Sequence, residues 1–217
     1  MQIHYLSQQN SVLNHFLAQI RDVTVQSDSM RFRRNIERIG EIMAYELSKN
    51  LNYQNIEIQT PLGVKSTTKI SENLVLCSIL RAGLPLHIGF LNYFDDAENG
   101  FVSAYRHHAN NDDSFEIKVE YQAVPEIGNK TLLLIDPMLA TGQSLLAVYN
   151  ALMIKSAPSD IHIAVVIAAP EGIAFLEQNL PENVHLWVAT LDEKLNEKNY
   201  IIPGLGDAGD LAFGSKM

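Results

Sequence analysis

Short apolar runs recur along the middle of this chain, and segments with helical spacing separate them. The runs have the length of buried strands and cover residues 74–80, 132–135, 161–168 and 184–189. The intervening helical segments are residues 84–94, 145–155 and 170–179. Strands that alternate with helices predict an α/β fold with a mainly parallel central sheet and helices on both of its faces.

The first fifty residues are patterned as amphipathic helices. Apolar side chains recur at helical spacing through residues 11–21, and a second stripe runs from Phe32 to Leu47. Asp28 or Ser29 is placed to cap the second helix. Arginines crowd its opening turns, and they predict a solvated face, with a subunit contact or an anion site as the alternative; they are Arg31, Arg33, Arg34 and Arg38.

Two further regions carry strand-like alternation. Ile56 and Ile58 predict a short strand that stops at Thr60 and Pro61, and residues 62–73 are expected to form a turn or loop. Later, residues 101–105 and 115–121 flank a wholly polar stretch at 107–114. This pattern predicts a β-hairpin with a mobile tip. The tip contains His107 and His108, but no third ligand at a suitable spacing supports a metal site.

Length and composition favour a single domain. The 217 residues divide into a helical arm at about 1–50, a core at about 51–199 and a tail at 200–217. A net charge of −9 disfavours nucleic acid as the main partner, because duplex binding depends on clustered basic residues. No run of about 18 apolar residues occurs, so the sequence predicts no membrane span. The single cysteine, Cys77, and the lack of a signal-like N-terminus favour a cytoplasmic protein.

The segment 131–144 is the strongest candidate for chemistry. A buried strand is followed by Asp136, then by the small and polar residues Ala140 to Ser144, and then by a helix. Backbone N–H groups at such a helix start, together with the hydroxyls of Thr141 and Ser144, would suit a phosphate. The alternative is an ordinary strand-to-helix turn capped by Ser144.

Two other segments invite a functional interpretation. Arg81 follows a buried strand and precedes Gly83, so it is either an anion contact at the carboxyl edge of the sheet or a surface arginine. The tail contains four glycines and two aspartates within residues 204–214. Its apolar residues favour a packed segment whose backbone approaches a flat ligand, and a floppy tail is the alternative.

These motifs together resemble those of the uracil phosphoribosyltransferases, a branch of the type I phosphoribosyltransferases. Residues 136–142 are similar to the phosphoribosyl pyrophosphate loop, and Pro137 replaces the second acidic residue that other branches carry. Residues 202–210, with Phe213 and Gly214, resemble the uracil-binding tail. Further similar segments are 79–84, 105–106, 168–172 and 191–196, so the likeness extends from about residue 30 to the end.

The resemblance implies a fold with a β-hairpin flap and a C-terminal hood that binds the base. It implies transfer of the 5-phosphoribosyl group from 5-phospho-α-D-ribose 1-diphosphate to uracil, which gives UMP and pyrophosphate. Mg²⁺ would be held mainly by pyrophosphate and water, without a dedicated protein ligand cluster. A homodimer or higher homo-oligomer is expected, and the hairpin would close over the site to exclude water.

The resemblance also assigns residues to roles. It gives catalytic roles to Asp136, Arg106 and Asp207. Contacts to phosphoribosyl pyrophosphate are expected from Arg81, Arg106, Asp136, Pro137, Met138, Leu139, Ala140, Thr141, Gly142, Gln143, Ser144 and Asp207. Contacts to uracil are expected from Ile201, Gly206, Asp207 and Ala208.

The chain departs from the family pattern at several positions. Gln143 replaces a second glycine of the loop, which matters if that position needs positive φ. Pro85 with Leu86 stands where the family has Gly-Met, and Leu211 replaces a basic residue. The alternatives are a non-catalytic regulator that binds the same ligands and a transferase for another base. A P-loop kinase is excluded because its Gly-x-x-x-x-Gly-Lys-Ser/Thr motif is absent.

Overall fold

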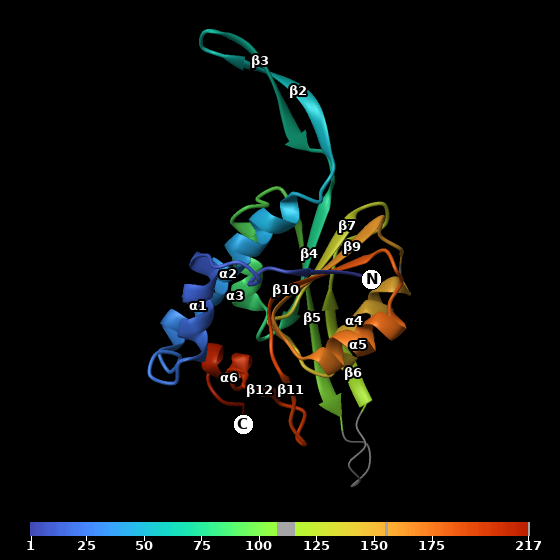
Figure 1. Ribbon diagram of the computed structural model, residues 1–217. Helices are drawn as coiled ribbons and strands as arrows, with labels where there is room; N and C mark the ends of the chain where they lie inside the picture. Colours follow the sequence, from blue (N-terminus) through green and yellow to red (C-terminus); the bar gives the residue numbers. More distant parts are fainter. Residues whose placement is uncertain (108–115, 155, 217) are drawn as a thin grey trace.

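A computed structural model of the chain describes residues 1–107, 116–154 and 156–216, without the side chains of 105–107 and 116–118. Within these residues a central eight-stranded sheet organises the molecule (Figure 1). Its strands lie in the order β1 (Gln2–Tyr5), β10 (Val184–Leu191), β9 (Asp160–Ala168), β7 (Thr131–Ile135), β4 (Leu74–Leu80), β5 (Glu98–His107) and β6 (Glu116–Ala123), with β8 (Met138–Leu139) paired to β9.

The sheet is mainly parallel, as the alternation of strands and helices predicts. All neighbours pair in parallel except β5 and β6, which form the predicted antiparallel hairpin. The predicted mobile tip at 107–114 falls almost wholly on residues 108–115, which lie outside the described residues. Edge strand β1 is a finding that the sequence pattern did not predict, because its four residues are defined by pairing with β10 rather than by burial.

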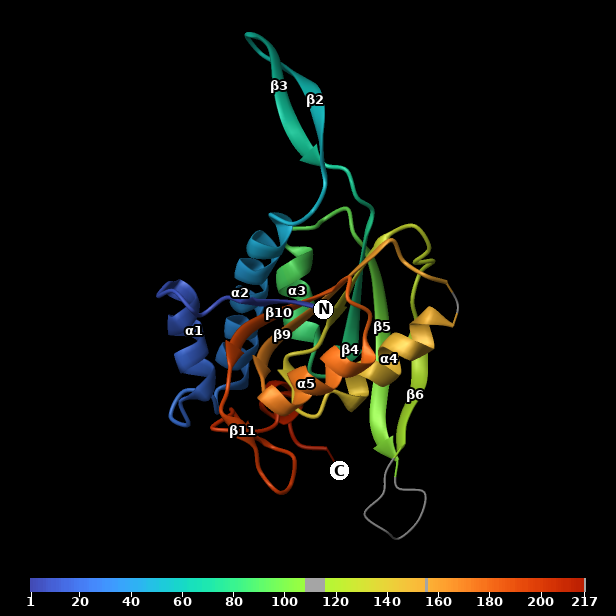
Figure 2. The same ribbon diagram turned by 45° about the vertical axis from the view of Figure 1, so that its right-hand side comes forward.

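Helices cover both faces of the sheet, which confirms the predicted layers (Figures 1 and 2). On one face lie α1 (Val12–Arg21), α2 (Ser29–Ser48) and α3 (Leu84–Leu91), and on the other α4 (Gln143–Met153) and α5 (Pro170–Asn179). Successive strand residues serve opposite cores: Leu133 packs with the first group, whereas Leu132 and Leu134 pack with the second. Because side chains point to the two faces in turn and both faces are covered, β4, β7 and β9 are apolar at most of their positions.

The prediction of a loop at residues 62–73 was wrong. Strands β2 (Tyr53–Thr60) and β3 (Gly63–Ile70) form a long antiparallel hairpin that projects away from the rest of the chain (Figures 1 and 2). Almost every residue of β3 is exposed, so it shows no alternation of buried and polar positions. Backbone pairing with β2, which the pattern of side chains cannot report, defines this strand.

The tail packs against the domain, so the floppy alternative was wrong. Strands β11 (Lys194–Leu195) and β12 (Ile201–Ile202) form a short antiparallel pair, and α6 (Ala208–Phe213) follows. Leu205, Ala208 and Ala212 are buried in the same core as α1 to α3. Arg33 of α2 donates a hydrogen bond to the carbonyl oxygen of Ala212 over 2.6 Å, so this arginine anchors the tail rather than facing solvent.

The remaining expectations are confirmed with small changes of boundary. Asp28 caps α2 by accepting a hydrogen bond from the backbone N–H of Arg31. Helices α3 and α4 end two or three residues before the predicted limits, since Leu91 and Met153 are their last residues. Trp187 is buried in the core, as expected. In the described part of the chain, no helix has the length and apolarity that crossing a bilayer requires.

Candidate active site

A cleft of about 430 Å³ opens at the carboxyl ends of β4, β5 and β7, where the tail folds back over the sheet. Open α/β sheets bind ligands at this edge. The cleft brings together nine residues that the sequence predicted: Arg81, Asp136, Met138, Ala140, Ser144, Ile201, Gly206, Asp207 and Ala208. Residues more than a hundred positions apart along the chain therefore line one cavity.

The start of α4 forms the floor of the predicted phosphate cup. Gly142 is the N-cap residue, its φ is +80°, and no side chain caps the helix. The alternative of an ordinary turn capped by Ser144 was therefore wrong, and the Ser144 side chain lines the cleft instead. A Cβ at Gly142 would lie 2.9 Å from Phe175 and 3.1 Å from the carbonyl oxygen of Gly172. Glycine is required here by both its backbone conformation and its packing.

The departure at Gln143 has a structural explanation. Gln143 is the first residue of α4, and it is not among the described residues that have positive φ. Its side chain is exposed and does not line the cleft. An L-residue is therefore accommodated, while the neighbouring Gly142 alone takes the left-handed conformation.

Asp136 follows directly after β7 and faces the cleft from the core of the sheet. Burial raises the pKa of its carboxyl from 3.8 to about 7, and a hydrogen bond from the Met138 N–H opposes this shift. That hydrogen bond is long, at 3.4 Å, so burial dominates. A carboxyl group that lines a cleft and has a pKa near 7 is typical of a functional site.

Arg81 lies just past the end of β4 and lines the same cleft as Asp136. Its Nη2 donates to Oδ1 of Asp210 over 3.1 Å and to the carbonyl oxygen of Gly214 over 3.0 Å. The side chain remains 40% exposed, so its other N–H groups are able to face an anion in the cleft. The interpretation of Arg81 as an ordinary surface arginine does not account for these contacts with the tail.

The hood presents backbone and carboxylate groups to the cleft. Asp207 caps α6, because its Oδ1 accepts a hydrogen bond from the Asp210 N–H over 2.9 Å. Its Oδ2 lies 3.9 Å from Nζ of Lys216, which also lines the cleft. Gly206 has a φ of +94°, which turns the chain immediately before Asp207. The hood thus offers one carboxylate beside a stretch of close-approaching backbone.

Other predicted residues lie elsewhere. Pro137 and Leu139 are buried, and the carbonyl oxygen of Pro137 accepts hydrogen bonds from Val166 and Ile167 of β9. Thr141, Gly142 and Gln143 do not line the cleft. Gly142 is the N-cap of α4, and Gln143 is the first residue of that helix. Arg106 belongs to β5, but its side chain lies outside the described residues, as do the side chain of His107 and the whole of His108.

The structure also adds lining residues that the sequence did not suggest. They are Ile79, Leu80, Ala82, Ser103, Ala104, Asn199, Tyr200, Gly209 and Lys216. Most are small or apolar and carry no chemical signal. Lys216 is the exception, since it is the last basic residue of a tail already predicted to bind a ligand.

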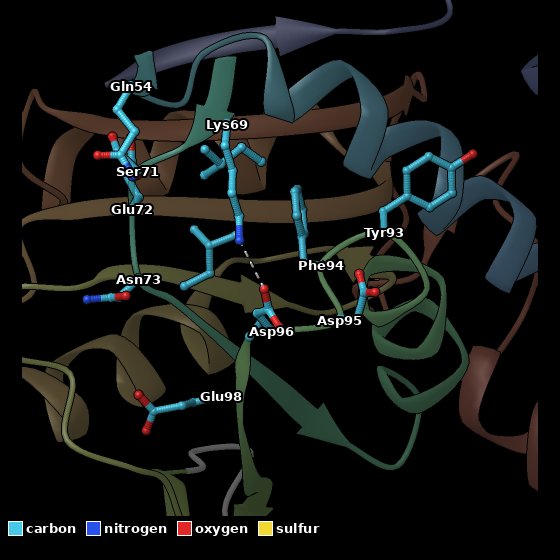
Figure 3. Close-up of a pocket in the computed structure, with 13 residues that line it drawn as sticks. Gln54, Lys69, Ser71, Glu72, Asn73, Tyr93, Phe94, Asp95, Asp96 and Glu98 are labelled. Carbon is cyan, nitrogen blue, oxygen red and sulfur yellow. Dashed lines mark ion pairs between the residues drawn. The ribbon is translucent and has the colours of Figure 1, made fainter. Parts of the chain in front are cut away.

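A second cavity of about 410 Å³ lies at the opposite edge of the sheet, beneath the β2–β3 hairpin (Figure 3). Carboxylates dominate its wall, and Lys69 pairs with Asp96 over 3.7 Å. Figure 3 labels the acidic side chains Glu72, Asp95, Asp96 and Glu98 around this space. Because these charges repel a pyrophosphate, the cleft at the carboxyl edge is the better candidate for an anionic substrate.

Comparison with known proteins decides the family. A sequence model of the family described as uracil phosphoribosyltransferase matches residues 7–215. The chain belongs to the uracil phosphoribosyltransferase family. The uracil phosphoribosyltransferase of Porphyromonas gingivalis is 49% identical over 217 residues, which cover 100% of both chains. That of Thermococcus gammatolerans is 37% identical over 98% of this chain and 94% of its own.

Solved structures agree with the predicted fold. A protein from Aquifex aeolicus superimposes with a TM-score of 0.87 at 31% identity, covering 98% of each chain. A purine phosphoribosyltransferase from Pyrococcus horikoshii has a TM-score of 0.50 at 13% identity over 73% of this chain and 84% of its own. At that identity the similarity concerns the fold alone. The predicted α/β architecture of the type I phosphoribosyltransferases is confirmed.

Proposed function

We propose that this uracil phosphoribosyltransferase family member transfers the 5-phosphoribosyl group of 5-phospho-α-D-ribose 1-diphosphate to uracil, with the cleft at the carboxyl edge as the active site. The products are UMP and pyrophosphate. Full-length similarity to the P. gingivalis enzyme carries this proposal. The convergence of Arg81, Asp136 and the hood on one cavity gives it a physical basis.

The sugar phosphate binds along the floor of the cleft. The 5′-phosphate accepts hydrogen bonds from backbone N–H groups at the start of α4 and from the hydroxyl of Ser144, which lines the cleft. The Thr141 hydroxyl, which does not line the cleft in this structure, would have to turn toward the phosphate to add a further donor. The Asp136 carboxylate accepts hydrogen bonds from the ribose hydroxyls. Burial disfavours the charged form of Asp136 and raises its pKa to about 7. Hydrogen bonds from the ribose hydroxyls would favour the charged form and so lower this pKa when substrate binds.

The pyrophosphate lies on the opposite side, between arginines. Arg81 and Arg106 each offer a planar guanidinium that matches two phosphate oxygens at once. In Arg81, Nη2 already donates hydrogen bonds to the tail, at Asp210 and Gly214. The substrate therefore either binds the remaining N–H donors of Arg81 or displaces these contacts. Arg106 belongs to β5, the strand next to β4.

Mg²⁺ fits this site as a substrate-borne ion. No group of three or more His, Cys, Asp or Glu side chains able to hold a metal occurs among residues 1–107, 116–154 and 156–216. Pyrophosphate oxygens and water would be the main ligands of Mg²⁺, and Asp136 and Asp207 line the same cleft. The bound ion would neutralise charge that develops on the leaving pyrophosphate.

Uracil binds beneath the hood and supplies the nucleophile. Its O2 and O4 accept hydrogen bonds and its N3–H donates one, a pattern that backbone groups of Gly206, Asp207 and Ala208 match. Ile201, which is buried, packs against the ring. Cytosine reverses the pattern at N3 and C4, so it would leave buried groups unpaired.

The reaction exchanges one bond at C1′ for another. The bond from C1′ to the pyrophosphate oxygen breaks as the bond from uracil N1 to C1′ forms, and the N1 proton is released. C1′ develops oxocarbenium character in such displacements. Asp136 and Asp207 place negative charge near that centre, and the β5–β6 hairpin would exclude water that competes with uracil.

A direct assay tests the proposal. Purified protein is incubated with labelled uracil, phosphoribosyl pyrophosphate and Mg²⁺, and the products are separated, with cytosine and adenine as control bases. We expect UMP from uracil alone. Tight binding of either ligand without UMP would instead support a non-catalytic regulator, and turnover of another base would identify a different transferase.

Two broader expectations stay predictions. The homodimer or higher oligomer is testable by light scattering. The cytoplasmic location rests on the single cysteine, Cys77, which is buried and unpaired. No step of the proposed reaction depends on either one.

A further inference from the structure

We propose that Arg21 and Asp192 are positioning residues for uracil, acting through the backbone of Gly204. Neither residue lines the cleft. This inference rests on the proposed function, and it assigns to the N-terminal arm a part in recognising the base.

The side chain of Asp192 is held in a nearly closed environment. It is only 3% exposed, and both of its carboxylate oxygens are engaged. Oδ1 accepts from Nη2 of Arg21, and Oδ2 accepts from Nη1 of Arg21 over 2.9 Å. The backbone N–H of Asp192 is also fixed, because it donates to the carbonyl oxygen of Ala168 at the end of β9 over 2.8 Å. The bidentate pair is therefore anchored to the rigid sheet.

The same pair holds both backbone groups of one hood residue. The N–H of Gly204 donates to Oδ2 of Asp192 over 2.8 Å. The carbonyl oxygen of Gly204 accepts from Nη1 of Arg21 over 2.9 Å. An arginine from α1 and an aspartate after β10 thus clamp a residue more than a hundred and eighty positions from the arginine along the chain.

Gly204 lies at the point that sets the shape of the hood. Its φ is +65°, and a Cβ there would lie 2.2 Å from the carbonyl oxygen of Ile201, so the chain folds back tightly onto Ile201. Two residues later comes Gly206, which lines the cleft. A shift of Gly204 is therefore passed to Ile201 on one side and to Gly206 on the other.

The clamp acts on the base side of the site rather than on the phosphate side. The cup at the start of α4 depends on Gly142 and packs against α5 through Phe175 and Gly172. The clamp instead connects α1, the end of β10 and the hood. Loss of the clamp should therefore weaken binding of uracil with little effect on phosphoribosyl pyrophosphate.

Two variants test this, and both preserve the size of the side chain. Asp192→Asn keeps an oxygen acceptor but loses the charge, and Arg21→Lys keeps the charge but loses the planar fork. For Asp192→Asn we expect the KM for uracil to rise about tenfold or more, since charge-assisted hydrogen bonds to Arg21 and Gly204 weaken. The KM for phosphoribosyl pyrophosphate should stay within about twofold of wild type. Arg21→Lys should give a smaller change of the same kind.

Lys130→Met supplies the matched control. Lys130 is 20% exposed, close to the 23% of Arg21, and pairs with Glu98 at the opposite edge of the sheet. We expect both KM values to be unchanged. If the Asp192→Asn protein is folded and its uracil KM is unchanged, or if both KM values rise together, the proposal is wrong.

Hydrogen exchange gives a second readout that does not require turnover. The Gly204 and Gly206 amides should exchange faster in Asp192→Asn and Arg21→Lys, while amides of α4 keep the wild-type rate. Unchanged exchange at Gly204 would overturn the clamp itself. Failure of the wild-type protein to form UMP would overturn the proposed function. Hydrogen exchange at Gly204 and Gly206 would then still test whether Arg21 and Asp192 hold the backbone of Gly204.

Discussion

Arg81, at the end of β4, donates a hydrogen bond from Nη2 to Oδ1 of Asp210 in α6 over 3.1 Å. These residues are 129 positions apart along the chain. The contact connects the predicted pyrophosphate side of the cleft to the hood that covers the base. If phosphoribosyl pyrophosphate binds Arg81 through Nη2, it competes with a carboxylate of the same chain for that nitrogen.

Replacement of Asp210 tests that competition. Asp210→Asn should lower the KM for phosphoribosyl pyrophosphate by about twofold to fivefold, because exposed ion pairs of this kind contribute up to about 1 kcal/mol. Arg81→Ala is the comparison, and its KM should rise at least tenfold through loss of charge-assisted contacts. Steady-state kinetics with saturating uracil measure both. A higher KM in Asp210→Asn would mean that Asp210 orients Arg81 rather than competing with substrate.

Substitutions at the adjacent residues Gly142 and Gln143, at the start of α4, should have different effects. Gly142→Ala places a Cβ against Phe175 and Gly172 at a positive φ, so it should destabilise the protein by about 1–2 kcal/mol and reduce turnover. Gln143→Gly should leave activity within about twofold, since Gln143 is exposed and helical. Thermal unfolding and UMP formation measure the contrast. Equal losses in the two variants would contradict this account of the loop.

Replacement of Asp136 should stabilise the folded protein and reduce its activity. Its pKa is raised from 3.8 to about 7 by burial, so the folded state prefers the protonated carboxyl. The stability that this preference contributes is complete below pH 4 and is lost as the pH rises toward 7. Asp136→Asn should therefore gain about 2–3 kcal/mol in stability relative to wild type as the pH rises from 5 to 8. Urea unfolding at these two values measures the gain.

Activity provides the other half of this test. Asp136→Asn should lose about tenfold to a hundredfold in kcat/KM, because an amide replaces the carboxylate that receives the ribose hydroxyls. A variant that keeps full activity would remove Asp136 from the site. Ser144→Ala, which lines the same cleft, should show the smaller loss expected for a neutral hydrogen bond.

A buried histidine should make the protein sensitive to mild acid. His162 accepts a hydrogen bond from Nε1 of Trp187 over 3.0 Å. Its Nε2 has no hydrogen-bond partner in the described part of the chain, and Oδ2 of Asp160 lies 3.7 Å from it. The pKa of His162 is lowered to about 4, chiefly by burial; the carboxylates of Asp160 and Glu72 oppose this shift, and the neighbouring His185 and His4 contribute to it.

The sign of the effect follows from which state binds the proton. Between pH 6.5 and 4 the unfolded chain is protonated at His162 and the folded chain is not, so stability falls as the pH falls. Wild type should lose about 2 kcal/mol between pH 7 and pH 5 from this group. His162→Asn keeps an acceptor for Trp187 and should flatten the profile, as urea unfolding at both pH values would reveal. An unchanged slope would exclude His162 as the cause.

Removal of divalent metal should affect activity and leave the fold intact. Excess EDTA should abolish UMP formation, and Mg²⁺ should restore it, because the ion travels with the pyrophosphate. The thermal midpoint should not change, since no protein-only metal group occurs in residues 1–107, 116–154 or 156–216. A lower midpoint in EDTA would indicate a structural metal instead.

The sequence predicted the core of the fold because burial leaves a strong pattern there. Strands such as 74–80 and 161–168 are apolar except for one buried polar residue each, Ser78 and His162, since both of their faces are covered. Strand β3 left no such pattern, because it is exposed and its hydrogen bonds run to β2. Strand β1 was missed for the related reason that its partner, β10, lies at the far end of the chain.

Prediction of the site divides in the same way. The residues that carry chemical groups, Asp136, Arg81 and Asp207, were identified from the sequence and do line the cleft. The small and apolar lining residues, such as Ala104, carry no signal that distinguishes them from core residues. The clamp formed by Arg21 and Asp192 was also missed, because its partners lie 171 positions apart.

The sequence by itself determined the order of the core strands and helices, the family, and the identity of the charged groups, because each depends on local periodicity or on a short motif. The tertiary structure alone decided which of these groups face one another. It placed Arg81 against Asp210, fixed Gly204 between Arg21 and Asp192, and gave Gly142 rather than Gln143 the left-handed conformation. Such relationships depend on pairing and packing between distant segments, which local sequence patterns do not encode.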